Sequence, residues 1–384
     1  MAYMKTLTAL GLSLLITAGC STKKETQTTA SGLDPEKFAA QIDGKQVGLY
    51  TLKNASGMEV CITNFGGRIV SVMVPDRNGE LRDVVLGFDS IGAYLPDNNQ
   101  SDFGAAIGRY ANRIANGRIV VDGDTVQLPV NNFGHTLHGG PTGWQYKVYD
   151  VKQSNDSTLV LAITSPDGDN NFPGTVNAEV TYRLTADNAI DISYSATSDK
   201  KTPVNMTNHS YFNLSGDPNQ TIIDNIIYIN ADSFTPVDST FMTTGEILAV
   251  KGTPMDFTSP LPIATGYTDS IDYQQIVFGK GYDHNWVLNT KGDITKEAAR
   301  LTSPASGITL SVYTTEPGIQ FYAGNFLDGS TTGKKGIKYE RNTGVCLETQ
   351  HYPDSPNKPE WPSAWLNPGE TYTSRCIYRF STEK

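Results

Sequence analysis

The sequence predicts an all-β protein, a large antiparallel β-sandwich with few short helices. Short apolar or alternating segments recur along the chain, separated by turn signals such as Asp122-Gly123 and Asp187-Asn188. Gly (36 residues), Pro (20) and Tyr (19) are abundant, which favours short strands and turns over long helices. No repeat of fixed period and no later shift of composition divides the chain, so we expect one large domain.

The first 20 residues have the features of an export signal. Lys5 precedes a short apolar stretch, residues 7–16, that is too short to span a bilayer comfortably as a helix. Residues 17–20, TAGC, place small residues directly before Cys20, as in a bacterial lipoprotein signal, although such signals usually have Leu where this chain has Thr17. We therefore expect an exported lipoprotein, anchored through the lipidated Cys20 on the periplasmic or cell-surface side. An ordinary cleaved signal peptide is the alternative.

A flexible tether is expected over residues 21–33, which are polar, rich in Ser, Thr and Lys, and without an apolar period. The folded domain is then expected over residues 34–384. Its three cysteines, Cys61, Cys346 and Cys376, cannot form a disulfide framework, so the fold must depend on its core. The formal net charge of −10 and the absence of a Lys/Arg-rich run argue against nucleic acid as a partner.

The expected strands follow one another along this domain with short turns between them. They are expected at residues 46–52, 58–63, 68–74, 83–87, 119–121, 125–128, 158–164, 176–184, 189–196, 226–230, 286–288, 307–314, 320–325, 344–349 and 371–380. Short helices are expected at residues 35–40, 91–94 and 296–299.

One further segment, residues 202–216 (TPVNMTNHSYFNLSG), is expected to be a strand with two different faces. Alternation places polar side chains, His209 among them, on one face, and Met206, Phe212 and Leu214 on the other, which suits a core. The polar face consists of Asn205, Thr207, His209, Tyr211 and Asn213. If that face is buried, its groups need hydrogen-bond partners, which a polar ligand such as a sugar could supply. A solvated face with a structural histidine is the alternative.

Two polar segments lie earlier in the chain. In GRYANRIANGRI (residues 108–119), Arg113 or Arg118 could bind two hydroxyl or ring oxygens at once, although single arginines are usually surface charges. In NNFGHTLHGG (residues 131–140), the two histidines do not have the spacing of a zinc site, and no Cys or carboxylate lies close by, so we expect no metal there. The two glycines after His138 would allow the backbone to approach a ligand closely.

Two more polar segments lie in the second half of the chain. GYDHNW (residues 281–286) contains Asp283, and in VCLETQHYPDSP (residues 345–356) alternation places Glu348 and Gln350 on one face. An acidic side chain in an apolar strand is rarely buried without a reason, a structural salt bridge being the ordinary one. A His/Glu pair can act as acid and base near neutral pH, because environment shifts their reference pKa values of about 6.5 and 4.3. The sequence contains no phosphate-binding loop and no nucleophile elbow.

Taken in order, the segments GRYANRI, TLHGG, TNHSYFNLSG, YDHNW, PGIQFYAGNF and CLETQHYPDSPN resemble the aldose 1-epimerase (galactose mutarotase) family, over about residues 64–380. The resemblance implies a galactose mutarotase-like supersandwich. It also implies an isomerase of hexose metabolism that interconverts the α and β anomers of free sugars such as glucose and galactose by acid/base ring opening. No cofactor is required for this chemistry. A bound Ca²⁺ is possible, as in some relatives, but nothing in the sequence indicates one.

The resemblance also implies roles for individual residues. His209 matches the proton donor and Glu348 the proton acceptor of the family. The matching sugar-binding positions are Arg113, His138, Asp283 and Gln320, with Asn112 and Tyr211 beside them. Two departures from the family pattern, Glu316 where Gln is frequent and His351 where Asn is common, are expected at most to tune sugar preference.

The expected partner is therefore a small aldose, with contact to a membrane only through the lipid anchor and with no expectation about oligomeric state. A non-catalytic carbohydrate-binding sandwich is the main alternative. A glycoside hydrolase is a second, because paired carboxylates such as Asp283 and Glu348 could flank a glycosidic bond. A sugar-phosphate epimerase would need a cluster of basic residues at the pocket, which the sequence does not show.

Overall fold

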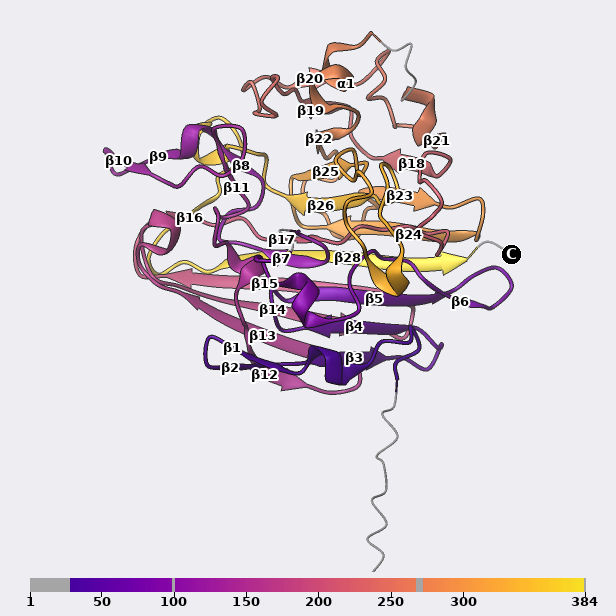
Figure 1. The fold of residues 1–384 in the computed structure, drawn as a ribbon. Coiled ribbons are helices and arrows are strands. Elements are labelled where there is room, and N and C mark those ends of the chain that lie inside the picture. Colours follow the sequence, from indigo (N-terminus) through magenta and orange to yellow (C-terminus); the bar gives the residue numbers. More distant parts are fainter. Residues whose placement is uncertain (1–27, 99–100, 267–271, 383–384) are drawn as a thin grey trace, which may run out of the picture.

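One long antiparallel sheet forms one layer of the protein, and two smaller sheets cover the same face of it (Figure 1). The computed structural model describes residues 28–98, 101–266 and 272–382. The long sheet has nine strands, in the order β12 (Asp150–Ser154), β13 (Thr158–Ser165), β14 (Val176–Leu184), β15 (Ala189–Ser198), β28 (Tyr372–Thr382), β24 (Ile308–Thr314), β23 (Ala299–Thr302), β18 (Ile226–Ile229) and β21 (Leu261–Pro262).

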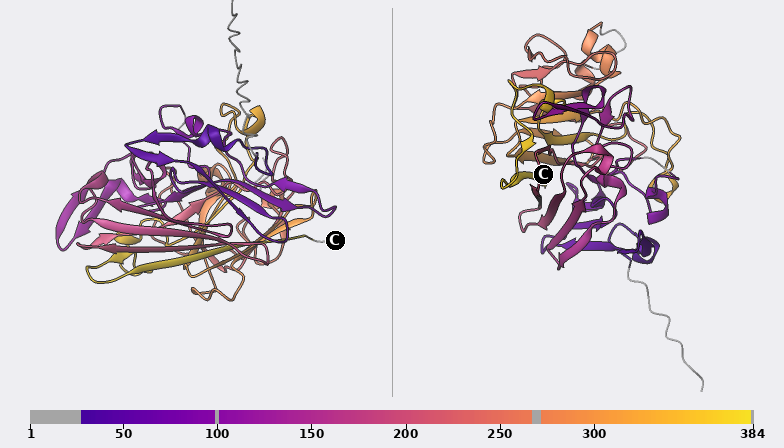
Figure 2. Two further views of the ribbon diagram at one scale, coloured as in Figure 1. Left: turned by 90° about the horizontal axis from the view of Figure 1, so that it is seen from below. Right: turned by 90° about the vertical axis from the view of Figure 1, so that its left-hand side faces the viewer.

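The two smaller sheets have four and five strands. The first consists of β3 (Leu49–Lys53), β4 (Glu59–Thr63), β5 (Arg68–Pro75) and β6 (Leu81–Asp83). The second has the order β20 (Leu248–Ala249), β19 (Ser233–Thr235), β22 (Asp283–Val287), β25 (Gly318–Tyr322) and β26 (Cys346–Gln350). Seen from below, the indigo and purple strands of the four-stranded sheet lie to one side of the magenta and yellow strands of the long sheet (Figure 2, left).

Five two-stranded pairs complete the strand list. They are β1 (Ala40–Ile42) with β2 (Lys45–Val47), β7 (Ala105–Ile107) with β17 (Thr207–His209), β8 (Arg113–Ile114) with β11 (Thr136–Leu137), β9 (Arg118–Val121) with β10 (Asp124–Gln127), and β16 (Thr202–Pro203) with β27 (Trp365–Leu366). Within the described residues there is one α-helix, α1 (Gln274–Gly279), and the other helices are short 3-10 turns at residues 35–38, 91–94, 115–117, 144–146, 169–171, 263–266, 334–336 and 355–357. In that part of the chain, no helix has the length and apolarity needed to cross a membrane.

The predicted all-β sandwich is confirmed, and its core joins the three sheets. Val60 of β4, Val180 of β14 and Trp286 of β22 belong to one continuous cluster of buried apolar side chains. The predicted turns are confirmed as well. At the β9–β10 turn, Asp122 and Gly123 have φ of 51° and 98°, the two positive values that a tight hairpin with right-handed strand twist requires.

Residues 202–216 do not form the single strand that we expected. They form β16 and β17 with a break between them, because Asn205 turns away to bind other backbone segments. Its side-chain amide donates to the carbonyl oxygens of Ala111 and His351 and accepts from the His351 N–H. Met206, Phe212 and Leu214 are fully buried, as predicted. Asn213 is also used internally, since its amide donates to three backbone carbonyls.

Two further expectations about local structure were wrong. Residues 296–299 are not helical, because Ala299 begins β23, and α1 was not predicted. The tether does not extend to residue 33, because Thr29, Ser31 and Leu33 are buried against the domain, and the N–H of Ala30 donates to Glu59 at 2.7 Å. The predicted signal, Cys20 and the remainder of the tether lie outside the described residues.

Candidate active site

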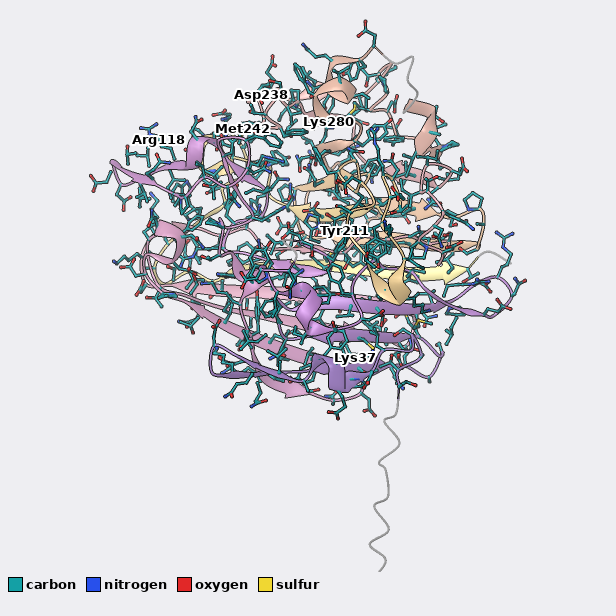
Figure 3. All side chains as sticks on the ribbon, viewed as in Figure 1. Lys37, Arg118, Tyr211, Asp238, Met242 and Lys280 are labelled. Carbon is teal, nitrogen blue, oxygen red and sulfur yellow. The ribbon has the colours of Figure 1, made fainter. Side chains whose placement is uncertain are left out.

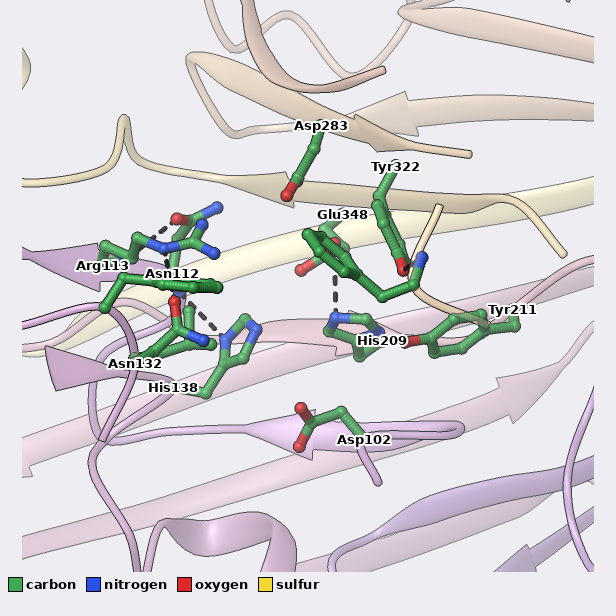
Figure 4. Close-up of a pocket in the computed structure, with 13 residues that line it drawn as sticks. Asp102, Asn112, Arg113, Asn132, His138, His209, Tyr211, Asp283, Tyr322 and Glu348 are labelled. Atoms are coloured by element: carbon green, nitrogen blue, oxygen red, sulfur yellow. Dashed lines mark hydrogen bonds and ion pairs between the residues drawn. The ribbon is translucent and has the colours of Figure 1, made fainter. Parts of the chain in front are cut away.

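A cavity of about 400 Å³ opens to solvent between the five-stranded sheet, the β8–β11 pair and the β7–β17 pair (Figure 4). Tyr211, which follows β17 and lines the cavity, shows that the cavity lies near the middle of the molecule (Figure 3). The cavity is lined by Asp102, Asn112, Arg113, Asn132, Phe133, Leu137, His138, His209, Tyr211, Asp283, Tyr322, Phe326 and Glu348. Two imidazoles, three carboxylates and one guanidinium therefore share one small space, which is the composition of a site for a polar ligand.

One side of the cavity is built by the register of β22, β25 and β26. Gln320 lies directly opposite Glu348, and Tyr322 lies opposite Asp283. Directly opposed residues of antiparallel strands point to the same face, so these four side chains are brought together by pairing. The Gln320 amide donates to Oδ1 of Asp283 at 2.7 Å. Leu347, the neighbour of Glu348, points into the core, as the predicted alternation requires.

The β8–β11 pair joins two segments that are 26 residues apart in sequence. The N–H of Asn112 donates to Nδ1 of His138 at 3.1 Å, and the N–H of His138 donates to the carbonyl of Asn112 at 3.1 Å. Both residues have positive φ, 62° and 51°, a conformation that is uncommon for residues other than glycine. Because Nδ1 accepts a hydrogen bond, neutral His138 carries its proton on Nε2.

The neutral form of His138 is strongly favoured. Burial lowers its pKa well below the usual value, and the nearby His209 and Arg113 lower it further. The Nε2–H of His138 can therefore donate a hydrogen bond into the cavity near neutral pH.

Arg113 supplies the positive charge of the site. Its Nε donates to Oδ1 of Asn132 at 3.1 Å, and its guanidinium carbon lies 5.2 Å from the ring centroid of Phe241. Burial lowers its pKa, whereas Asp283 and Glu348 raise it, and an arginine keeps its charge under these conditions. The two terminal nitrogens remain as donors for a ligand.

His209 and Glu348 lie close together in the cavity. Nε2 of His209 lies 3.6 Å from Oε1 of Glu348, and Nδ1 lies 3.5 Å from Sγ of Cys346. Tyr211 stacks on the imidazole with a centroid separation of 5.1 Å. Both side chains are almost fully buried, and in the described part of the chain Oε2 of Glu348 has no hydrogen-bond partner.

The environment of Glu348 makes it a much weaker acid than an exposed glutamic acid. Burial raises its pKa to about 7, and Asp283 and Asp102 act in the same direction, against His209 and Arg113. A carboxyl group with this pKa can accept and release a proton near neutral pH.

Two groups of potential metal donors meet in the cavity, and both contain His209. The first adds Asp102 and His138, and the second adds Cys346 and Glu348. In the first, the proton on Nε2 of His138 occupies the nitrogen that would have to bind the metal. In the second, burial raises the pKa of the Cys346 thiol well above its usual value, so the thiol is protonated when no metal is bound. The hydrogen bond to Nδ1 of His138 therefore argues against a metal at the first group.

The structure brings together most of the residues that the resemblance implied. His209, Glu348, Asn112, Arg113, His138, Tyr211 and Asp283 all line the cavity. Gln320 does not line it and contacts the site through Asp283. Arg118 is exposed on β9, and His135 bonds to the backbone of Asn116 and to Thr240 instead of facing the cavity.

The two glycines after His138 serve the fold rather than a ligand. A Cβ on Gly139 would lie 2.3 Å from the carbonyl oxygen of Gly108, and Gly140 packs against Asn170. The expected close approach is therefore made to another part of the backbone.

Six lining residues were not among the predicted site residues. Asn132, Phe133 and Leu137 lie in a segment whose composition pointed to a site, but nothing in their own pattern distinguished them. Tyr322 and Phe326 lie in PGIQFYAGNF, a segment that supports only the resemblance. Asp102 lay outside every such segment. Conversely, Glu316 and His351 do not line the cavity, and they form an ion pair of 2.7 Å between Oε2 and Nδ1. We interpret these two departures as one structural pair and not as determinants of sugar preference.

The fold and the site thus define a β-sandwich enzyme that performs acid/base chemistry on a polar small molecule. The sequence profile of the aldose 1-epimerase family matches residues 48–379, and the chain belongs to that family. It is 42% identical to an aldose 1-epimerase of Escherichia coli K12 over 344 residues. These residues cover 89% of this chain and 97% of that protein. It is 43% identical to a galactose mutarotase of Mus musculus over 324 residues, and this aligned region covers 84% of this chain and 91% of the mouse protein.

Solved structures agree with the architecture. An aldose epimerase homologue from C. elegans superposes with a TM-score of 0.81 at 32% identity, over 88% of this chain and all of that one. A galactose 1-epimerase from Lactobacillus acidophilus superposes with a TM-score of 0.78 at 27% identity, over 90% of this chain and 97% of that one.

Proposed function

We propose that this protein interconverts the α and β anomers of free hexoses, with Glu348 as general base and His209 as general acid. The observation that carries this proposal is the pairing of these two groups in an open cavity, 3.6 Å apart, with the pKa of Glu348 raised to about 7. Family membership supports the reaction class, which is an isomerisation that requires no cofactor.

The reaction follows from the positions of the two groups. Ionised Glu348 removes the proton of the anomeric hydroxyl while protonated His209 donates its Nε2 proton to the ring oxygen. The bond between C1 and the ring oxygen breaks, and the anomeric C–O bond becomes the carbonyl of the open-chain aldehyde. Rotation about C1–C2 presents the other face of the carbonyl. The C5 hydroxyl then attacks the carbonyl carbon and returns its proton to His209. Glu348 gives its proton to the carbonyl oxygen, so the enzyme ends unchanged.

The remaining lining groups bind and orient the sugar in this proposal. Arg113 and neutral His138 are fixed donors for sugar oxygens, and fixed donors are effective where negative charge develops. Asp283 accepts from sugar hydroxyls, and Gln320 holds its carboxylate in place at 2.7 Å. Asn112 fixes His138, and Tyr211 fixes the plane of the His209 imidazole.

The experiment follows the optical rotation of freshly dissolved α-D-glucose and α-D-galactose with the purified protein. We expect faster approach to equilibrium, and a loss of about 10²- to 10⁴-fold in kcat for His209→Asn and for Glu348→Gln with unchanged melting temperature. Full activity in either variant would contradict the role of that residue. Sugar binding in calorimetry without any acceleration by the wild type would instead favour a carbohydrate-binding protein.

We also propose that the chain is an exported lipoprotein anchored through Cys20. The support is the short apolar stretch followed by TAGC at residues 17–20. Metabolic labelling with palmitate tests the anchor. Label in the wild type and its loss, together with loss of membrane association, in Cys20→Ser are expected. An unlabelled wild type would favour an ordinary signal peptide.

A further inference from the structure

Asp102 is a carboxylate of the cavity to which neither the sequence nor the proposed mechanism gives a role. It lies just before β7 and faces the cavity below His209 and His138 (Figure 4). One of its carboxylate oxygens lies within 4.8 Å of a ring nitrogen of each histidine. Its Oδ1 is buried and has no hydrogen-bond partner among the described residues. A buried carboxylate oxygen without a donor is costly, and because the Asp102 side chain lines the cavity, a ligand there can donate a hydrogen bond to the carboxylate.

Among the residues that the structure describes, no side chain is hydrogen-bonded or ion-paired to this carboxylate. Arg68, a nearby buried cation, directs its guanidinium N–H groups to the backbone carbonyls of Phe103, Ser101 and Gln145. Among the described residues, no cationic group lies within 4.0 Å of the Asp102 carboxylate. A structural salt bridge therefore does not explain it.

The position of Asp102 relative to the proposed catalytic pair indicates which part of a sugar it would meet. Figure 4 shows Glu348 on one side of His209 and Asp102 on the opposite side, with His138 next to Asp102. If Glu348 takes the proton of the C1 hydroxyl and His209 protonates the ring oxygen, C1 lies toward Glu348. The other neighbour of the ring oxygen is C5, and its substituent is the hydroxymethyl group. Asp102 thus lies on the C5 side of the ring.

We propose that Asp102 is a specificity-determining residue that accepts a hydrogen bond from the C6 hydroxyl of a hexose. This inference rests on the roles of His209 and Glu348 given above, because these set the orientation of the ring. It makes the site selective for hexoses over sugars that lack a C6 hydroxyl, such as pentoses and 6-deoxyhexoses. A hydroxyl donating to a carboxylate forms one of the stronger hydrogen bonds, so its loss has a measurable effect on rate.

The test compares sugars that differ at C6 alone. Initial rates of mutarotation are measured with D-glucose, 6-deoxy-D-glucose and D-xylose, and with D-galactose and 6-deoxy-D-galactose, for the wild type, Asp102→Ala and Asp102→Asn. Ser101→Ala is the matched control, because this neighbour does not line the cavity and its hydroxyl has no hydrogen-bond partner in the protein. Melting temperatures identify variants that fail to fold.

For the wild type, we expect kcat/KM to be about 10- to 100-fold higher for glucose than for 6-deoxyglucose. Asp102→Ala should lower kcat/KM for glucose by the same factor. For 6-deoxyglucose, kcat/KM of this variant should stay within about twofold of the wild-type value. This difference is the signature of a contact between the mutated residue and the deleted hydroxyl. Asp102→Asn, which keeps an acceptor oxygen without the charge, should lie between them. Ser101→Ala should match the wild type with every sugar.

Three results would overturn the proposal. One is an equal loss of kcat/KM for glucose and 6-deoxyglucose in Asp102→Ala, which would indicate that Asp102 acts on His209 and not on the C6 hydroxyl. Another is an unchanged rate with all sugars. The third needs no variant, since a wild type that does not distinguish glucose from 6-deoxyglucose has no such contact. A wild type without activity on any of these sugars would contradict the proposed function itself, which keeps the two failures apart.

Discussion

His209 and Glu348 face each other across 3.6 Å, measured from Nε2 to Oε1, which is too long for a direct hydrogen bond. The two groups are therefore not hydrogen-bonded directly to each other. Each can still engage a ligand, because both side chains line the cavity. In a cyclic aldose, the anomeric hydroxyl and the ring oxygen are both bonded to C1. The sugar can therefore contact Glu348 and His209 at once, which is the requirement for ring opening.

The first prediction concerns the pH dependence of the reaction. Burial raises the pKa of Glu348 to about 7, and the general base must be ionised to act. The ionised fraction falls as pH decreases through this value, so kcat/KM should fall about tenfold per pH unit below about pH 6.5. The measurement is the rate of mutarotation from pH 5 to 8, corrected for the spontaneous reaction in each buffer.

Melting temperatures over the same range show whether the protein remains folded while activity falls. A rate that stays constant down to pH 5 would mean that Glu348 has an ordinary pKa or is not the base.

The second prediction concerns Cys346, whose Sγ lies 3.5 Å from Nδ1 of His209. This contact fixes the imidazole from the side opposite the ligand, so Cys346→Ala should lower kcat about 2- to 10-fold with little change in KM. Cys346→Ser, which keeps a polar partner, should lose less. Cys61→Ala is the control, because Cys61 is buried in β4, away from the cavity, and should leave kcat unchanged.

The same thiol should be chemically inert in the folded protein. Burial raises its pKa well above the usual value, and the thiolate is the reactive form. Thiol titration at pH 7 should detect no rapidly reacting cysteine until a denaturant is added. Rapid modification coupled to inactivation would show that Cys346 is accessible.

His209 and Glu348 could be predicted as site residues from sequence because each lies in a locally recognisable segment, and the resemblance to the family implied their catalytic roles. Glu348 stands in an apolar strand whose alternation directs it away from the core, and His209 stands among polar residues of a similar pattern. Asp102 could not be found in this way. It enters the cavity because β7 pairs with β17, where Ala105 lies opposite His209, and this contact joins residues more than one hundred positions apart. Periodicity reports on local faces and contains no information about such pairings.

The strand expected at residues 202–216 shows the opposite error. Its alternation of polar and apolar residues is real, and the core positions were correct, but Asn205 competes for backbone hydrogen bonds of Ala111 and His351 and interrupts the ladder. β17 ends at His209, so Tyr211 lies beyond the strand, and its ring stacks on the His209 imidazole. Side-chain competition of this kind depends on partners that the local sequence does not identify.

The third prediction separates binding from chemistry at Gln320. Its amide donates to Asp283 at 2.7 Å, and this hydrogen bond favours the ionised carboxylate against burial, which raises the pKa of Asp283. Gln320→Ala should therefore raise KM for glucose about tenfold and change kcat less. Gln320→Met keeps the approximate size without the donor and should behave like the alanine variant. Recovery of a normal KM in the methionine variant would show that Gln320 acts by filling space.

The last prediction concerns stability and the ion pair between His351 and Glu316, in which Nδ1 and Oε2 lie 2.7 Å apart. Burial alone would lower the pKa of His351, but the charge and hydrogen bond of Glu316 outweigh it and raise the pKa above 6.5. A histidine with a raised pKa in the folded state contributes stability that is fully present below pH 6.5 and is lost as pH rises through the folded-state value.

His351→Gln should therefore lower the free energy of unfolding by about 2 kcal/mol at pH 6 and by clearly less at pH 9. Lys45→Ala is the matched control, since it breaks an exposed pair with Asp150 and should cost less than about 1 kcal/mol at both pH values. Denaturant unfolding of the wild type and the two variants at pH 6 and 9 provides the measurement. Equal destabilisation by His351→Gln at both pH values would mean that His351 stabilises the fold by packing and not by its charge, because the remaining contacts of the imidazole do not change with protonation.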